Sequence, residues 1–252
     1  MTCLAGRTAI VTGGGRGIGR ATVDRLLAAG ANLVTCGRGE RPADLSPAAF
    51  WVQADVSRAA DVERLLAAAR DYAGPVSILV NNAGIQLEKT VVDTTDDDWD
   101  RLIDINCRGV FNMCRAFVPQ VPETGGSIVN LGSISGDVAD PAMAIYNASK
   151  GFVHALTRSI AVDHGPRIRC NAVRPGWIMT EMAEAGFALA RNPENAKADA
   201  LARHPAGRFG KAEDVAEAIL WLVSDRCDFV TGHCFTIDGG LTSASPLRPG
   251  LF

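Results

Sequence analysis

Tyr146 and Lys150 stand four residues apart, a spacing that places two side chains above one another on one face of a helix. A free phenol has a pKa of about 10 and transfers protons poorly at neutral pH, but a neighbouring cation stabilises the phenolate and lowers that pKa. Such a pair could take a proton from an alcohol or give one to a carbonyl. A Tyr and a Lys at this spacing more often belong to a solvated helix face. The rest of the chain therefore has to show whether this pair transfers protons.

A glycine-rich segment near the N-terminus could bind phosphate. Its spacing is Gly13-x-x-x-Gly17-x-Gly19, and no G-x-G-x-x-G register fits. Glycines allow a sharp turn, a close approach of the backbone to phosphate and tight packing of helix on strand, and the N–H groups at a helix start bind pyrophosphate. A short apolar strand directly before the segment and an alanine-rich helix directly after it favour nucleotide binding over a merely flexible turn.

The elements that must position these residues alternate between strand and helix. Strands are expected at 9–12, 32–36, 50–54, 77–80, 127–131, 168–173 and 234–237, and helices from the glycine segment to about 29 and at 58–72, 95–118, 145–164 and 212–224. This alternation predicts an α/β fold of one domain, a Rossmann-like, doubly wound parallel β-sheet with helices on both faces. The stretch at about 177–208 is too long for a plain connection and is interpreted as a substrate lid.

The composition is that of an ordinary globular protein. Of the 252 residues, 47% are hydrophobic and 21% charged, and the net charge of −3 indicates no affinity for nucleic acid or a membrane surface. No signal pattern or membrane-length apolar run is present, and the seven cysteines form no C-x-x-C, so a cytoplasmic location is expected. The four histidines have no ligand spacing, and we expect no metal site. They are His154 and His164, expected on a helix surface or in an interface, and His204 and His233.

Several motifs together resemble those of the short-chain dehydrogenase/reductase family. The resemblance covers residues 7 to about 240 and rests on residues 12–19 and 81–84 (Asn-Asn-Ala-Gly), Asn106, Ser133, the Tyr146-x-x-x-Lys150 pair and Pro175-Gly176. It implies an NAD(P)-linked oxidoreductase acting on CH–OH or C=O groups. Tyr146 would then be the general acid or base and Ser133 would bind the substrate oxygen. Lys150 would lower the pKa of Tyr146 and bind the nicotinamide ribose.

Asn106 is the fourth residue of the catalytic set that the resemblance implies. In this family it helps to hold a water that links the lysine, here Lys150, to solvent. An asparagine inside an apolar helical stretch could equally be a hydrogen-bonded residue that bends the helix.

The resemblance also implies a nicotinamide cofactor site. Its expected residues are Gly13, Gly15, Arg16, Gly17, Ile18, Gly19, Arg38, Asp55, Val56, Asn82, Ala83, Gly84, Tyr146, Lys150, Pro175, Gly176, Ile178 and Thr180, while Asn81 would brace the sheet. The end of the second strand, which separates NAD from NADP in this family, holds Gly37 and Arg38 and no carboxylate. Arg16 and Arg38 suit a 2′-phosphate, so NADP(H) is expected, with NAD(H) as the alternative if both arginines are merely solvated.

Residues next to these motifs are candidates for substrate contact: Ser133, Ser135, Asp137, Met143, Gln86, Trp177, Met182 and Phe187. The apolar lid favours a hydrophobic ketone or secondary alcohol, whereas Gln86, Glu88 and Asp137 keep a sugar or polyol open. The lid aromatics could equally be plain packing.

The family resemblance also suggests a homotetramer, with a homodimer as the alternative. Five apolar residues could supply the interface: Phe111, Met113, Phe152, Val153 and Leu156. The tail 241–252 is expected to pack on a neighbouring subunit near its lid.

Three functions therefore stand at this point. The leading hypothesis is an NADP(H)-dependent carbonyl reductase/alcohol dehydrogenase, and the alternative within enzymes is an NAD-dependent sugar or polyol dehydrogenase. A non-catalytic, nicotinamide-cofactor-binding regulatory protein is the remote alternative, because such proteins typically break the Tyr-x-x-x-Lys pair, which is whole here.

Overall fold

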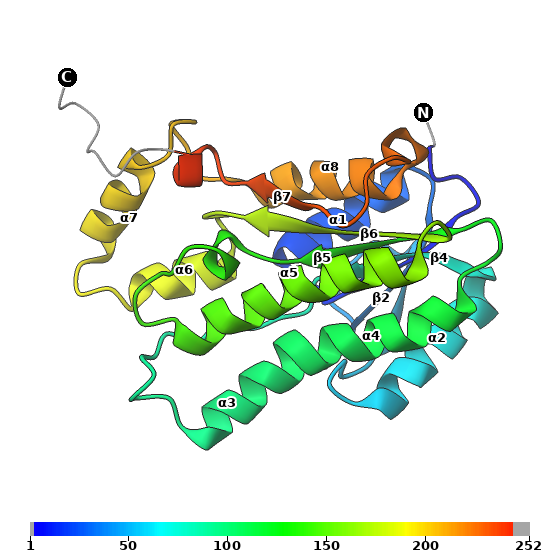
Figure 1. Ribbon diagram of the computed structural model, residues 1–252, viewed down its shortest axis with the longest axis horizontal. Coiled ribbons are helices and arrows are strands. Elements are labelled where there is room, and N and C mark those ends of the chain that lie inside the picture. Colours follow the sequence, from blue (N-terminus) through cyan, green and yellow to red (C-terminus); the bar gives the residue numbers. More distant parts are fainter. Residues whose placement is uncertain (1–2, 244–252) are drawn as a thin grey trace.

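The computed structural model describes residues 3–243, which contain a seven-stranded parallel sheet (Figure 1). The strand order is β3-β2-β1-β4-β5-β6-β7, and every neighbouring pair is parallel. The strands are β1 (Thr8–Thr12), β2 (Asn32–Gly37), β3 (Ala49–Gln53), β4 (Val76–Asn81), β5 (Gly126–Leu131), β6 (Ile168–Pro175) and β7 (Cys234–Ile237). The predicted Rossmann-like parallel sheet is confirmed.

Helices cover both faces of the sheet. One face carries α1 (Gly17–Ala28) and α8 (Ala212–Val223), and the other carries α2 (Ala59–Ala73), α4 (Gly109–Phe117) and α5 (Ala144–His164) (Figure 1). All residues of β1 and β4 are buried, as expected for central strands covered on both sides. The two faces therefore have separate apolar cores, one on each side of the sheet.

Two of the five residues expected at a subunit interface belong to this core. Met113 and Val153 are buried because they face the sheet, so that part of the prediction is wrong. Phe111 and Phe152, on the outer sides of α4 and α5, are exposed. The tetramer itself stays a prediction.

The helix expected at 95–118 is built in three parts. α3 (Asp96–Ile103) leads through a π-helical turn (Asp104–Arg108) into α4. Thr95 caps the start of α3, since its hydroxyl accepts a bond from the Asp98 N–H and the Asp98 carboxylate accepts one from the Thr95 N–H. π-turns are rare inside helices and often occur at functional sites, and this one contains Asn106.

A buried chain of side-chain hydrogen bonds fixes α5 against the sheet. Asn130 on β5 is fully buried, accepts a bond from Asn81 on β4 at 2.8 Å and donates to Thr157 on α5 at 2.9 Å. Asn81 thus braces the sheet, as expected. Because Thr157 lies on the helix that also carries Tyr146 and Lys150, these bonds help to set the position of that helix over β5.

The lid at about 177–208 contains α6 (Glu181–Ala188) and α7 (Pro193–Ala202), which lie together beyond one end of the sheet (Figure 1). Its base is fixed by backbone bonds from Gly210 to Trp177 and from Met179 to Gly210, each 2.9 Å long. Of the tail, only a 3-10 turn at Leu241–Ser243 lies within the described residues, and the packing predicted for the rest lies outside them. Within 3–243, no helix combines the length and apolarity needed to cross a membrane.

Replacing Thr157 by Val should weaken folding. Valine keeps the shape of threonine but leaves the buried Asn130 amide without its oxygen acceptor, which costs about 1–3 kcal/mol of unfolding free energy. Ser159→Ala is the matched control. The Ser159 hydroxyl donates to a backbone carbonyl four residues earlier in the helix, as the Thr157 hydroxyl does, but Ser159 is exposed. Urea unfolding of both variants measures the difference, and equal stabilities would contradict the role given to the Asn130–Thr157 bond.

Candidate active site

One cavity of about 560 Å³ lies along the carboxyl ends of the strands, on both sides of the β1–β4 junction. Strand order reverses at that junction, and open α/β sheets bind ligands at such a point. All the residues expected to bind the cofactor line this cavity except Gly19, and so do Ser133, Tyr146 and Lys150. The tertiary structure therefore brings the glycine loop and the Tyr–Lys pair to one cavity.

Glycines at the start of α1 let the loop and helix approach each other. A Cβ on Gly19 would overlap the carbonyl oxygen of Gly13 and the side-chain amide of Asn82. That amide donates to the carbonyl oxygens of Thr12 at 2.9 Å and of Gly13 at 3.1 Å, and so holds the loop in place. Gly13 and Gly17 have φ values of 68° and 53°, which glycine adopts without strain.

The N-terminus of α1 carries no side-chain cap and begins at residues that line the cavity. Its free N–H groups and positive dipole end suit a phosphate group. Together with the space left by the glycines, this arrangement fits the pyrophosphate of a dinucleotide cofactor.

The two arginines expected at the cofactor site differ in their surroundings. The guanidinium group of Arg38 is exposed and makes no hydrogen bond or ion pair within residues 3–243. Arg16 instead pairs with Glu181 of α6 across the cavity, with an N–O distance of 2.8 Å. Arg38 is therefore the arginine of the two that is free to bind an anion.

At the other end of the cavity, Tyr146 and Lys150 lie on the first turns of α5. The Lys150 ammonium donates a 2.8 Å hydrogen bond to the Leu131 carbonyl and lies 5.5 Å from the centre of the Tyr146 ring. Ser133 follows the end of β5, where its hydroxyl accepts a 3.1 Å bond from the Ser135 N–H. The site thus places a phenol, an ammonium and a hydroxyl around one space.

Burial determines the pKa values of the pair. It raises the pKa of Tyr146 to about 12, an effect that the Ser133 hydroxyl partly offsets and that the charges of Asp140 and Glu88 increase. Burial also lowers the pKa of Lys150 to about 8. Burial thus dominates the pKa of Tyr146, and the expectation that Lys150 lowers this pKa stays a prediction. A phenol that stays protonated at neutral pH is suited to giving a proton.

Asn106 is a fully bonded residue that joins two segments near the site. Its side chain exchanges two 2.9 Å hydrogen bonds with the backbone of Ile85, accepting from the N–H and donating to the carbonyl. It also donates to the Ser149 hydroxyl at 3.2 Å. The side chain therefore ties the segment after β4 to α5, as a satisfied polar group would. Its role in holding a water stays a prediction.

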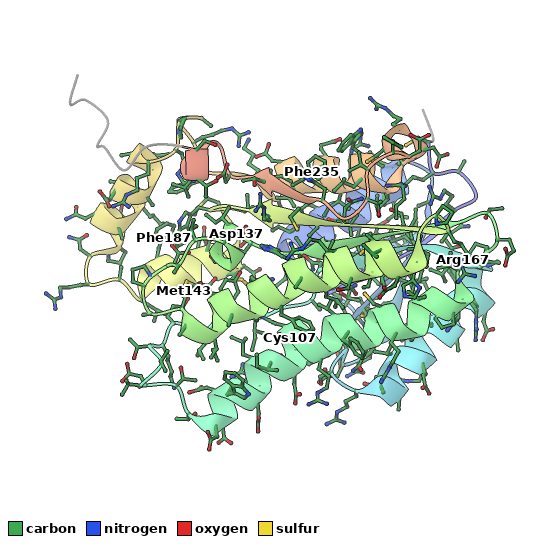
Figure 2. All side chains as sticks on the ribbon, in the orientation of Figure 1. Cys107, Asp137, Met143, Arg167, Phe187 and Phe235 are labelled. Atoms are coloured by element: carbon green, nitrogen blue, oxygen red, sulfur yellow. The ribbon has the colours of Figure 1, made fainter. Side chains whose placement is uncertain are left out.

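The expected substrate residues fall into two groups. Ser133, Gln86, Trp177 and Met182 line the cavity, whereas Ser135, Asp137, Met143 and Phe187 do not. Figure 2 shows that Asp137, Met143 and Phe187 nevertheless lie at the same end of the sheet.

Other contacts explain why four of these residues do not line the cavity. Asp137 is paired with Arg174 of β6, and Ser135 donates a 2.9 Å bond to Asp140. Met143 is buried at the start of α5. Phe187 is buried and stacks on Trp177, with ring centres 4.5 Å apart, so it serves as packing within the lid.

Some residues near the site were not foreseen. Pro42 and Trp51 line the cavity near its glycine loop. Neither a proline between expected strands nor an apolar residue within one indicates a cavity. His154 was expected on a helix surface or in an interface and is buried within the subunit instead, because its ring fills the space beside Gly132 and Gly136, two glycines on either side of Ser133. Within residues 3–243, no group of three His, Cys, Asp or Glu side chains is placed to hold a metal ion.

Comparison with known proteins gives consistent relatives. Residues 13–242 match the family model described as enoyl-(acyl carrier protein) reductase. The chain is 40% identical to 2-(S)-hydroxypropyl-CoM dehydrogenase 3 of Xanthobacter autotrophicus, over 92% of this chain and 95% of that protein. It is 37% identical to the NADP-dependent (R)-specific alcohol dehydrogenase of Lentilactobacillus kefiri, over 95% of this chain and 98% of that protein. The structure of aldohexose dehydrogenase from Thermoplasma acidophilum superimposes with a TM-score of 0.91 at 30% identity, covering 98% of this chain and 97% of that one.

The lowered pKa of Lys150 predicts a specific dependence of stability on pH. Between about pH 8 and pH 10.5 the unfolded chain binds the Lys150 proton and the folded chain does not, so the folded protein gains stability as the pH rises. Lys150→Met removes this gain. In urea unfolding from pH 7 to 10.5, the unfolding free energy of wild type should rise relative to that of Lys150→Met. Lys211→Met, at an exposed site, should show the same pH dependence as wild type. A constant difference between wild type and Lys150→Met would contradict the burial argument.

Proposed function

The chain belongs to the short-chain dehydrogenase/reductase family, whose members are oxidoreductases of CH–OH and C=O groups, and from this premise we propose that it interconverts ketones and secondary alcohols with NADP(H). The observation that carries the proposal is a single cavity with two chemically different ends. One end holds Tyr146 and Ser133 for proton transfer, and the other holds an uncapped helix N-terminus and the free Arg38 for phosphate.

NADP(H), when bound, supplies or accepts the hydride. In the reductive direction, Tyr146, which is protonated at neutral pH, donates its phenolic proton to the carbonyl oxygen of the substrate. Ser133 donates a hydrogen bond to the same oxygen and holds it in place. Lys150, fixed by its bond to the Leu131 carbonyl, stabilises the negative charge that remains on the phenol oxygen. In alcohol oxidation Tyr146 accepts the proton instead.

Three observations support NADP(H) over NAD(H). The end of β2 carries Gly37 and Arg38, so a cation and no carboxylate would meet a 2′-phosphate. Within residues 3–243 the Arg38 guanidinium makes no bond that a phosphate would have to break, and Arg16 can add its charge if it leaves Glu181. One relative is named as an NADP-dependent alcohol dehydrogenase.

A second candidate function, an NAD-dependent sugar or polyol dehydrogenase, is favoured by one feature of the cavity wall. Gln86 lines the cavity, and its amide donates to the Glu88 carboxylate, so this side can bind hydroxyl groups. The structurally similar aldohexose dehydrogenase points in the same direction. Rates with a panel of ketones, secondary alcohols, sugars and polyols, each measured with both cofactors, decide between the two functions.

Tyr146→Phe should lower turnover by about 10²–10⁴-fold, the usual contribution of a positioned acid or base. The Kd for NADPH should change little, because the ring is kept and only the hydroxyl is lost. The chain has one other tyrosine, Tyr72, which is exposed and stacks on Phe50, so Tyr72→Phe is the matched control. Retained turnover in Tyr146→Phe would rule out the proposed proton donor.

Arg38→Asp should weaken NADPH binding relative to NADH by about 10- to 100-fold, because hydrogen bonds between charged groups contribute roughly 1.5–3 kcal/mol. Isothermal titration with both cofactors measures the ratio of the two Kd values. Arg101→Asp makes the same change of charge at an exposed position on α3, outside the cavity, and should leave the ratio unchanged. An unchanged ratio in Arg38→Asp would refute the cofactor argument.

A further inference from the structure

The side chain of Trp51 forms part of the cavity wall at the carboxyl end of β2. Trp51 lies on β3, beside β2 in the sheet, with its Cα paired to that of Thr35. Its six-membered ring lies next to both Gly15 of the glycine loop and Gly37 at the end of β2. If a dinucleotide binds in this cavity, the residues around this ring would meet its adenosine part.

Gly37 has no room for a side chain. A Cβ at this position would lie 2.7 Å from Cη2 and 3.1 Å from Cζ2 of Trp51, and the shorter of these distances is not sustained between carbon atoms. The backbone of Gly37 does not have a positive φ, so its conformation is open to other residues. Position 37 therefore needs a glycine because the indole occupies the space of a side chain, and not because of the backbone conformation there.

The indole is held in this place by its surroundings. Trp51 is half-buried and packs against the apolar core on the α1 side of the sheet. The loop before β3 is fixed by Arg41, whose guanidinium donates to the backbone carbonyls of Leu45, Ser46 and Ala49 at 2.8–2.9 Å. Pro42 of that loop approaches Gly15 on the same wall. Moving the ring would therefore disturb both the core and this loop.

We propose that Trp51 is a specificity-determining residue for the cofactor. By filling the space beside Gly37, it keeps that position without a side chain and so excludes a carboxylate from the place where one would accept a hydrogen bond from a ribose 2′-hydroxyl. The charged side chain that remains at the strand end is that of Arg38. The inference rests on the proposed use of a nicotinamide cofactor, but it concerns the coupling between positions 37 and 51 and not the substrate.

Four proteins test this coupling: wild type, Gly37→Asp, Trp51→Phe and the double variant. Phenylalanine keeps an apolar ring but lacks the outer indole atoms that approach Gly37. We expect Gly37→Asp alone to weaken binding of both NADH and NADPH, because the new side chain and the indole compete for one space. Adding Trp51→Phe should restore NADH binding by about ten- to a hundredfold and leave NADPH binding weak, as isothermal titration would show.

The control keeps Trp51 and changes its neighbour. Phe50 stacks on Tyr72 and is exposed, so Phe50→Leu combined with Gly37→Asp should not restore NADH binding. If Gly37→Asp alone binds NADH as tightly as the double variant does, the inference is overturned.

A smaller substitution covers the case in which Gly37→Asp does not fold. Gly37→Ala adds only a methyl group, so its melting temperature should fall in the presence of Trp51 and recover when Trp51→Phe is added. Equal losses in both backgrounds would overturn the inference. A preference of the wild-type protein for NADH would instead count against the proposed NADP(H) dependence, and the coupling would still be measured.

Discussion

The reversal of strand order between β1 and β4 is the constraint on which the rest of this structure depends. From β1 the chain continues to β2 and β3 on one side, and then crosses to β4, β5, β6 and β7 on the other. The carboxyl ends of β1 and β4 therefore border a crevice that no crossing connection covers. The N-terminus of α1 meets this crevice from one side and the first turns of α5 from the other, which is why distant parts of the chain line a single cavity.

Burial in this crevice shifts the pKa values of Tyr146 and Lys150 on the first turns of α5. Removing water disfavours the charged form of each, so the pKa of Tyr146 rises and that of Lys150 falls. The hydrogen bond from Lys150 to the Leu131 carbonyl fixes where the ammonium lies. The result is a neutral phenol next to a positioned cation at neutral pH.

The two ends of the cavity are specified in different ways. The end near Tyr146 is specified by polar groups whose partners are fixed, including Asn106 on the backbone of Ile85. The end near β2 is specified mainly by shape, because Trp51 fills the space beside Gly37 and leaves the exposed Arg38 as the charged side chain that follows the strand. Such a division suits a site in which one end carries out proton transfer and the other selects the cofactor.

Most of the fold and the ends of its strands and helices could be predicted from the sequence, because they depend on local patterns. Apolar runs marked the strands, and the glycine loop and the Tyr-x-x-x-Lys pair are motifs whose members lie close together in the chain. Their order along the chain was also enough to place them at one end of a parallel sheet.

The tertiary structure alone decided which side chains reach the cavity, because that depends on contacts between residues far apart in sequence. Arg174 holds Asp137 and Trp177 covers Phe187, so neither predicted substrate residue lines the cavity. The wall formed by Trp51 exists because β3 packs beside β2. The raised pKa of Tyr146 likewise follows from burial in the fold, whereas the sequence shows only the spacing between Tyr146 and Lys150. The sequence by itself thus determined the chemical groups and their order, and the packing decided which of them meet and how strongly burial shifts their pKa values.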